Sequence, residues 1–215
     1  MRTIKALACA AALAAGIATS MAQSNVYSLN VVGYYNITVA ANTAVVIANQ
    51  LNTTNNTLGA LIPSPPPSSW FYKFTGSWNA YQFDPDDLTW YPDSLVTLNL
   101  GEGGMYKPAA ATTLTFVGEV AQGALKNTGI SPLGANHVVS SMVPQAGQVT
   151  TALGFPAEPS DWVYQFTGSW NAYQFDPDDL TFYPNEPTVA VGEGFMIKKA
   201  AAGTATAWTR NFTVQ

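Results

Sequence analysis

The chain has 215 residues, of which 47% are hydrophobic and only 10% are charged, against about 25% charged in a typical globular domain. A disordered acidic or basic tail needs high net charge and few aromatic residues, so the composition excludes one. The length allows one large or two small domains, each able to bury a core of its own.

The first 22 residues have the pattern of a secretory signal peptide. Arg2 and Lys5 form a basic start, residues 6–17 are apolar and small, and small residues occupy positions −3 and −1 before Gln23. The apolar run is shorter than the roughly 20 residues that a membrane span needs. We therefore expect cleavage before Gln23 and a destination in the periplasm, at the cell surface or outside the cell.

Cleavage would change both the cysteine count and the charge. Cys9 is the only cysteine, so the mature chain would hold no disulfide, zinc–thiolate site or thiol nucleophile. Loss of Arg2 and Lys5 would leave six basic residues against 13 acidic ones, a net charge of −7. Because the basic residues are scattered, we expect no nucleic-acid partner and no anionic membrane surface, and no transmembrane segment after cleavage.

An internal repeat decides the domain organisation. Residues 74–89 read FTGSWNAYQFDPDDLT, and residues 166–181 repeat this segment without a change. The similarity extends outward more loosely, for example from GEGGMYK at residues 101–107 to GEGFMIK at residues 192–198. The predicted order is a signal peptide (1–22), an N-terminal strand segment (23–39), a first β module (40–120), a joint (121–132) and a second β module (133–215).

Within each module the residue pattern is typical of strands. Trp70, Tyr72 and Phe74 alternate with a mixed set of residues, and we expect this aromatic set to face the core. A Thr-Gly-Ser turn then predicts a β-hairpin with residues 78–83. The prediction is an all-β fold in which two duplicated antiparallel β modules pack as a pseudo-twofold sandwich or barrel, because about 80 residues alone bury only a modest core.

The Asp-Pro-Asp-Asp turn is the densest group of charges in either module. As a cap, its first aspartate accepts backbone N–H groups while the proline fixes φ at the next position. Alternatively, its carboxylates would hold Ca²⁺ through oxygen ligands, although the full EF-hand pattern is absent. Capping is favoured, and Ca²⁺ is the one cofactor that we keep as an alternative. The candidate metal ligands are Asp84, Asp86, Asp87, Asp176, Asp178 and Asp179.

Aromatic residues form the second candidate site. Trp78 has opposite parity to Tyr81 and Phe83 in its strand, so these side chains point to different faces of the sheet. If both faces are covered, all of them belong to a two-sided core, which is the favoured interpretation. If one face is open, its Trp and Tyr rings offer the rigid amphipathic surface against which sugar rings stack. The candidate ligand-binding residues are Trp78, Trp170, Tyr91 and Tyr183.

Catalytic groups are scarce. Glu102 and Glu193 each lie between two glycines, which favours a turn, and nothing fixes the separation of about 5–9.5 Å that a glycosidase carboxylate pair needs. His137 is the only histidine, its counterpart is Val45, and no G-x-S-x-G elbow occurs. We therefore predict no catalytic residue and no enzyme, and we expect His137 at the end of a strand.

Several short motifs resemble those of secreted β-rich repeat proteins from verrucomicrobial-type bacteria. They are NVVGY at residues 30–34, ANQL at 48–51, YKFTG at 72–76, LGEG at 100–103 and TFVGEV at 115–120. The second module keeps GEGF at residues 192–195 but has no TFVGEV segment. The resemblance implies export and β-rich repeats. It carries no activity and no site residue over to this chain.

Taken together, these patterns predict a secreted, non-catalytic protein of the cell envelope or exterior. The favoured function is a structural, self-assembling surface component, whose partners are copies of itself or other cell-surface proteins joined at strand edges or aromatic faces. The alternative is a carbohydrate-binding protein with two equivalent aromatic sites for a polysaccharide. A hydrolase that uses two carboxylates is the least favoured class.

Overall fold

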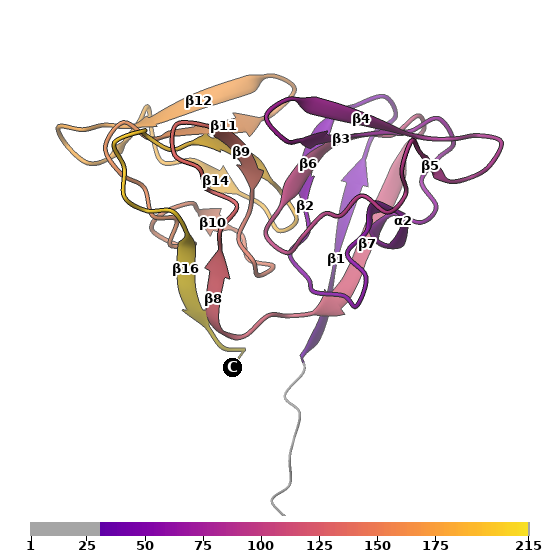
Figure 1. The fold of residues 1–215 in the computed structure, drawn as a ribbon, viewed down its shortest axis with the longest axis horizontal. Coiled ribbons are helices and arrows are strands. Elements are labelled where there is room, and N and C mark those ends of the chain that lie inside the picture. The colour runs from indigo at the N-terminus through magenta and orange to yellow at the C-terminus, as the bar shows by residue number, and fades with distance from the viewer. Residues whose placement is uncertain (1–30, 215) are drawn as a thin grey trace, which may run out of the picture. The chain divides into compact units, whose positions relative to one another are not determined.

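The computed structural model describes residues 31–214, so the predicted signal peptide and Cys9 lie outside the described residues. Nearly all regular structure in this range is β (Figure 1). The strands are β1 (Val32–Val39), β2 (Val45–Ala48), β3 (Trp70–Phe74), β4 (Trp78–Phe83), β5 (Trp90–Tyr91), β6 (Gly103–Lys107), β7 (Thr112–Glu119), β8 (Gly123–Asn127), β9 (Asn136–Val139), β10 (Gly147–Gln148), β11 (Trp162–Phe166), β12 (Trp170–Phe175), β13 (Phe182–Tyr183), β14 (Thr188–Val189), β15 (Phe195–Lys198) and β16 (Trp208–Phe212). One short helix, α2 (Leu58–Leu61), accompanies them, and no helix in the described range is long and apolar enough to cross a membrane.

Two five-stranded antiparallel sheets carry the sequence repeat. The first has the strand order β2-β6-β3-β4-β5, and the second has the equivalent order β9-β15-β11-β12-β13. The register is repeated as well, since Phe74 lies opposite Trp78 and Phe166 lies opposite Trp170. The predicted all-β fold of two duplicated antiparallel modules is confirmed. Among the described residues neither sheet pairs its own outer strands with each other, so the sandwich form of the prediction applies.

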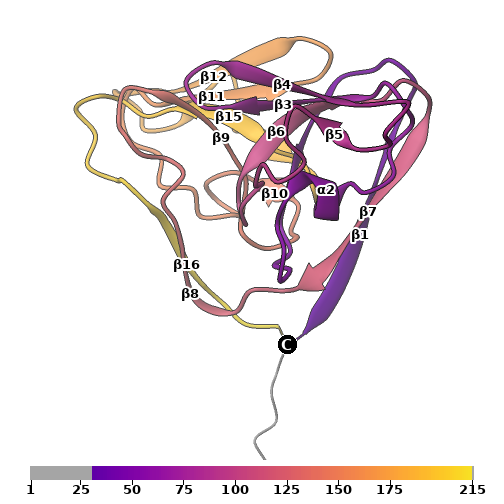
Figure 2. The same ribbon diagram turned by 45° about the vertical axis from the view of Figure 1, so that its right-hand side comes forward.

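Two-stranded ribbons extend the repeat beyond the sheets. β1 pairs with β7, and β8 pairs with β16 in the matching register: Tyr35 lies opposite Phe116, and Asn127 lies opposite Trp208. β8 falls within residues 121–132, the expected joint, and it is the structural counterpart of β1. Each structural repeat therefore begins with a ribbon strand, continues through a five-stranded sheet and ends with the partner strand of the ribbon (Figures 1 and 2).

The buried face of each sheet is the one opposite to our expectation. Phe71 and Val163 are almost fully buried, whereas Trp70, Tyr72 and Phe74 are only half-buried on the outer face. Phe71 packs edge-on against Trp90, at 6.4 Å between ring centroids, inside the first core. The prediction that the aromatic set faces the core is wrong, because alternation fixes which residues share a face but not which face is covered.

The two repeats meet through their Gly-Glu-Gly loops. Gly101 and Gly192 have φ values of 79° and 77°, a conformation that strongly favours glycine. The backbone N–H of Ala48 donates to Gly192 O at 2.8 Å, and that of Ser140 donates to Gly101 O at 2.9 Å. Each loop thus binds the edge strand of the other repeat, and the arrangement is reciprocal about a pseudo-twofold axis.

Close backbone approach at this axis requires two further glycines. A Cβ atom added to Gly103 would lie 3.0 Å from Ile47 O, 2.9 Å from Val138 Cγ1 and 3.5 Å from the Cα atom of Gly194. A Cβ atom added to Gly194 would likewise lie 3.0 Å from Ile47 O. Side chains at these positions would force the repeats apart, so the glycines set how closely the sheets pack.

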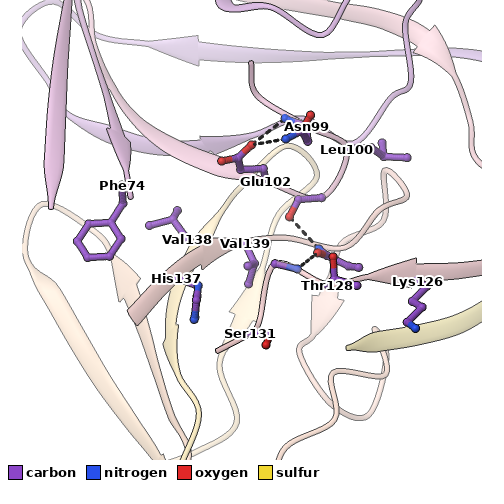
Figure 3. Close-up of a pocket in the computed structure, with 13 residues that line it drawn as sticks. Phe74, Asn99, Leu100, Glu102, Lys126, Thr128, Ser131, His137, Val138 and Val139 are labelled. Carbon is purple, nitrogen blue, oxygen red and sulfur yellow. Dashed lines mark hydrogen bonds between the residues drawn. The ribbon is translucent and has the colours of Figure 1, made fainter. Parts of the chain in front are cut away.

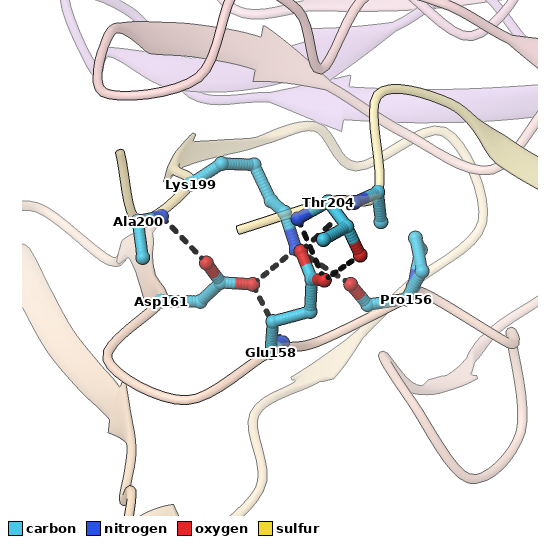
Figure 4. Close-up of polar contacts among 7 residues, drawn as sticks. Pro156, Glu158, Asp161, Lys199, Ala200 and Thr204 are labelled. Atoms are coloured by element: carbon cyan, nitrogen blue, oxygen red, sulfur yellow. Dashed lines mark hydrogen bonds and ion pairs between the residues drawn. The ribbon is translucent and has the colours of Figure 1, made fainter. Parts of the chain in front are cut away.

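A buried lysine in the second repeat forms a network of ion pairs and hydrogen bonds (Figure 4). Lys199 is fully buried, and its ammonium group pairs with Asp161 and with Glu158, the latter at 2.9 Å. It also donates to Pro156 O at 2.7 Å, while Asp161 Oδ1 accepts the backbone N–H of Ala200 at 2.7 Å. The network joins the end of β15 to the loop of residues 156–161. The ammonium nitrogen has three oxygen partners, which offset the cost of burying its charge.

Glu158 holds the next segment of chain through the same carboxylate. Its oxygens accept the backbone N–H groups of Thr204 at 2.8 Å and Ala205 at 3.0 Å, and the hydroxyl of Thr204 at 2.7 Å. Partial burial raises the pKa of Glu158, but these hydrogen bonds and Lys199 outweigh burial and lower that pKa to about 2.

Replacing Lys199 by methionine should destabilise the protein by about 3–5 kcal/mol, because Asp161 would stay buried without its counter-charge. Chemical denaturation with a two-state fit measures this loss. The matched control is Lys198→Met, which changes an exposed neighbouring lysine and should stay within about 0.5 kcal/mol of wild type. A loss below about 1 kcal/mol for Lys199→Met would contradict the role given to the network.

Glu158 should also make stability depend on pH. Its pKa is lower in the folded protein than in the unfolded chain, so its contribution is complete above the ordinary pKa near 4.5 and is lost as the pH falls toward 2. The melting temperature of Glu158→Gln should therefore lie below that of wild type at pH 6, and the gap should close by pH 2. A gap that stays constant over this range would contradict the assignment.

Candidate functional site

The outer faces of the two sheets carry an unusual density of aromatic side chains. We call this surface the aromatic face; its members are Trp70, Tyr72, Phe74, Trp78 and Tyr91 in the first repeat and Trp162, Tyr164, Phe166, Trp170 and Tyr183 in the second. Their register shows that they share a face, since Trp70 lies opposite Gln82 and Gln82 lies opposite Tyr91. Lys107 lies opposite Trp70 on the other side, so a lysine, a tryptophan, a glutamine and a tyrosine form a row across the sheet.

Ring contacts organise the aromatic face along the strands. Trp70 stacks on Tyr72 with 6.1 Å between centroids, and Phe74 meets Trp78 edge-on at 5.2 Å. The second repeat reproduces both contacts, at 6.1 Å and 5.1 Å. Aromatic pairs in these geometries are favourable beyond the area that they bury, so these contacts stabilise the ring orientations of the aromatic face.

The two halves of the aromatic face meet at the pseudo-twofold axis. Trp78 and Trp170 stack on each other with 6.4 Å between centroids and 30° between planes, and each remains 36% exposed. Both residues follow the hairpin turns that lead into β4 and β12 (Figure 1). Two of the four predicted ligand-binding residues are therefore in contact, and the two predicted sites form one surface.

The other two predicted residues lie at the outer edges of the same surface. Tyr91 is 69% exposed and Tyr183 is 74% exposed, and they belong to β5 and β13, the outermost strands of their sheets. The favoured interpretation of the sequence, a core on both faces of each sheet, is wrong for this surface. The aromatic rings on it are half-buried or exposed.

The first Asp-rich turn is arranged as a cap. Asp84 Oδ1 accepts the backbone N–H groups of Asp86 at 2.7 Å and Asp87 at 3.1 Å. The N–H groups of Asp87 and Asp86 lower the pKa of the Asp84 carboxyl, because both stabilise its charged form. This is the geometry that the capping interpretation requires.

The second Asp-rich turn repeats the cap. Asp176 Oδ1 accepts the backbone N–H of Asp178 at 2.8 Å, and Asp179 Oδ1 accepts the backbone N–H and the hydroxyl of Thr181. Within residues 31–214, no three His, Cys, Asp or Glu side chains lie close enough together to hold a metal ion. The carboxylates of Asp84, Asp176 and Asp179 thus accept hydrogen bonds within their own turns, and a calcium site stays a prediction.

The Gly-Glu-Gly glutamates also bind their own surroundings. Glu102 pairs with Lys73 at 2.9 Å and accepts the backbone N–H of Asn99 at 2.9 Å. Glu193 accepts the side-chain amide of Gln165 at 2.9 Å and the backbone N–H of Ala190 at 2.8 Å. These bonds hold the loops that join the repeats, which gives both carboxylates a structural role.

The structure also contains a pocket that the sequence analysis missed. A pocket of about 380 Å³ lies between Asn99–Glu102 of the first repeat and the β8–β9 region of the second (Figure 3). Phe74 of the aromatic face and His137 both line it. The one available signal was the difference between the copies, in which His137 stands where the first repeat has Val45.

Comparisons of the chain with protein-family models, with curated proteins and with solved structures find no match. The resemblance to the secreted repeat proteins of verrucomicrobial-type bacteria therefore stays a prediction. The functional argument accordingly rests on the geometry of the aromatic face and of the pocket beside it.

Proposed function

We propose that this protein is a secreted, non-catalytic carbohydrate-binding protein whose two repeats present one aromatic face to a polysaccharide. The observation that carries the proposal is the Trp78–Trp170 stack at the pseudo-twofold axis. It joins two identical sets of half-exposed rings into a single surface, which suits an extended chain of sugar rings better than a small isolated ligand.

The residues between the rings support this proposal. Gln82 and Lys107 flank Trp70 on the outer face, and Gln174 and Lys198 flank Trp162 in the second repeat. Side chains of this kind offer hydrogen-bond donors to sugar hydroxyls, while the rings bind the apolar faces of the sugars. The glutamates that a hydrolase would use are engaged in loop contacts, which supports a binding role over a catalytic one.

Replacing both Trp78 and Trp170 by alanine should lower retention on the bound polysaccharide at least about tenfold, equivalent to about 1.4 kcal/mol. The reason is that the change removes the centre of the aromatic face. Retention of the purified protein on a panel of insoluble polysaccharides, with and without Ca²⁺, measures the effect.

The control for this experiment is Tyr34→Ala, which removes an exposed ring on the β1–β7 ribbon and should leave retention unchanged. Circular dichroism of the double variant should match wild type, because both tryptophans are partly exposed. Carbohydrate binding would be contradicted if the wild-type protein were retained no better than the double variant on any polysaccharide of the panel.

A second candidate function, self-assembly at the cell surface, is favoured by the β1–β7 ribbon. Val32, Tyr34 and Val117 are each more than half exposed on it, and Tyr34 lies directly opposite Val117. The strands are eight residues long, and low charge leaves such ribbons poorly protected against pairing with another chain.

Self-assembly predicts multimers of the purified protein in light scattering, at concentrations where Tyr34→Lys is monomeric. A lysine at this position should block pairing because it places a charge on the exposed ribbon. Tyr91→Lys is the matched control, since it adds the same charge on the aromatic face. A wild-type monomer at high concentration would remove this candidate.

A further inference from the structure

The pocket of about 380 Å³ lies where the two repeats differ in the side chains beside the Gly-Glu-Gly loop. In the first repeat, Tyr35 and Ile37 of β1 pack over the loop glycine Gly192: a Cβ atom there would lie 2.7 Å from Tyr35 Cε2 and 2.8 Å from Ile37 Cδ1. In the second repeat the matching positions hold Asn127 and Gly129. A Cβ atom added to Gly101, the loop glycine on this side, would lie 2.5 Å from Asn127 Nδ2 and 2.9 Å from Met142 Cγ, so Met142 takes part of the space that Tyr35 fills in the first repeat. Gly129 has no side chain where the first repeat has the butyl group of Ile37, and it lines the pocket.

The equivalence of Tyr35 and Asn127 rests on their hydrogen bonds as well as on their register. Tyr35 Oη donates to Ala48 O at 2.6 Å, and Asn127 Nδ2 donates to Ser140 O at 3.2 Å, at the same point of each repeat. Asn127 also donates to Gly101 O at 2.9 Å and accepts the backbone N–H of Gly129 at 2.8 Å. Asn127 thus makes the same hydrogen bond to the edge strand as Tyr35, but its side chain is much smaller.

The pocket carries a positive charge in an acidic protein. Glu102 is the one acidic residue that lines it, and Lys73 neutralises that carboxylate at 2.9 Å. Lys126 also lines the pocket, is exposed, and forms no ion pair with any residue in the range 31–214. The charge of Lys126 therefore favours a ligand with an anionic group.

The remaining groups suit a body rich in hydroxyls. His137 Nε2 lies 2.9 Å from Pro132 O, and because a carbonyl only accepts, that nitrogen carries the hydrogen. In the neutral imidazole Nδ1 is then an acceptor, and Thr128 and Ser131 also line the pocket. The ring of Phe74 lies at the opposite side of the pocket from Lys126 (Figure 3).

We infer that this pocket binds one acidic sugar residue, a polyhydroxylated ring that bears a carboxylate. Lys126 faces the carboxylate, His137 accepts from a ring hydroxyl, and Phe74 contacts the apolar side of the ring. The choice of a sugar rests on the proposed function, because Phe74 belongs both to the pocket and to the aromatic face. Pockets of this size are typical of small-molecule sites.

Calorimetric titration with glucuronate and galacturonate, and with glucose and galactose as neutral parents, tests the inference. At least one uronate should bind about tenfold tighter than its parent, and the difference should shrink with added salt. Lys126→Gln should remove this preference. His137→Val, which introduces the residue found in the first repeat, should weaken the binding of the same uronate. Arg210→Gln, which removes a positive charge outside both the pocket and the aromatic face, is the matched control.

Equal binding of acidic and neutral sugars, no binding of any of the four, or a preference that survives Lys126→Gln would overturn the inference. An oligouronate separates two sources of the ligand: a chain end binds tighter than the monosaccharide, whereas a free sugar acid binds best alone. The double variant Trp78→Ala with Trp170→Ala should lower polysaccharide retention at least about tenfold but leave uronate binding unchanged. If the wild-type protein is retained on a polysaccharide but binds no uronate, only the proposal for the pocket is overturned. If it binds a uronate but is not retained, only the proposal for the aromatic face is overturned.

Discussion

The structure depends on the reciprocal pairing of each Gly-Glu-Gly loop with the edge strand of the other repeat. Ile47 bridges to Glu193 and Val139 bridges to Glu102, so β2 and β9 end the sheets without leaving those bridge positions open. The glycines at 103 and 194 let the backbones approach closely enough for this pairing. Because the pairing places the two sheets about one axis, it also brings Trp78 and Trp170 into contact.

The two copies agree where the aromatic face is built and differ where the ribbons and supporting networks are built. Residues 74–89 and 166–181 are identical, and their ring contacts agree within 0.1 Å in the Phe–Trp pairs. By contrast, Lys199 and Asp161 form a buried ion pair at positions where the first repeat has Pro108 and Ser69. The aromatic face is thus symmetric, while the pocket beside Phe74 lies where the two repeats differ.

The sequence was sufficient to predict what depends on local pattern. The strands of the hairpins and their turns follow from alternation and from Thr-Gly-Ser, and the structure contains both. Parity also predicted correctly that Trp78 and Phe83 lie on different faces.

What the sequence did not predict depends on contacts between distant residues. The buried face of β3 was assigned wrongly, since Phe71 is buried only because residues such as Trp90 cover that side. The equivalence of β1 and β8 was not visible in the sequence, because Tyr35 and Asn127 occupy matching positions but differ in size and residue type. The single aromatic face and the pocket both arise from the way in which the repeats meet, which strand periodicity does not encode.

The number of sugar chains that one molecule binds tests the central claim most directly. Calorimetry with an oligosaccharide of the retained polysaccharide, long enough to reach from Trp70 to Trp162, should give one chain per protein molecule. Replacing Trp78 alone by alanine should lower the affinity while the number stays at one, because both repeats belong to the same surface. Two independent and equal binding events per molecule would contradict the claim and restore two separate sites.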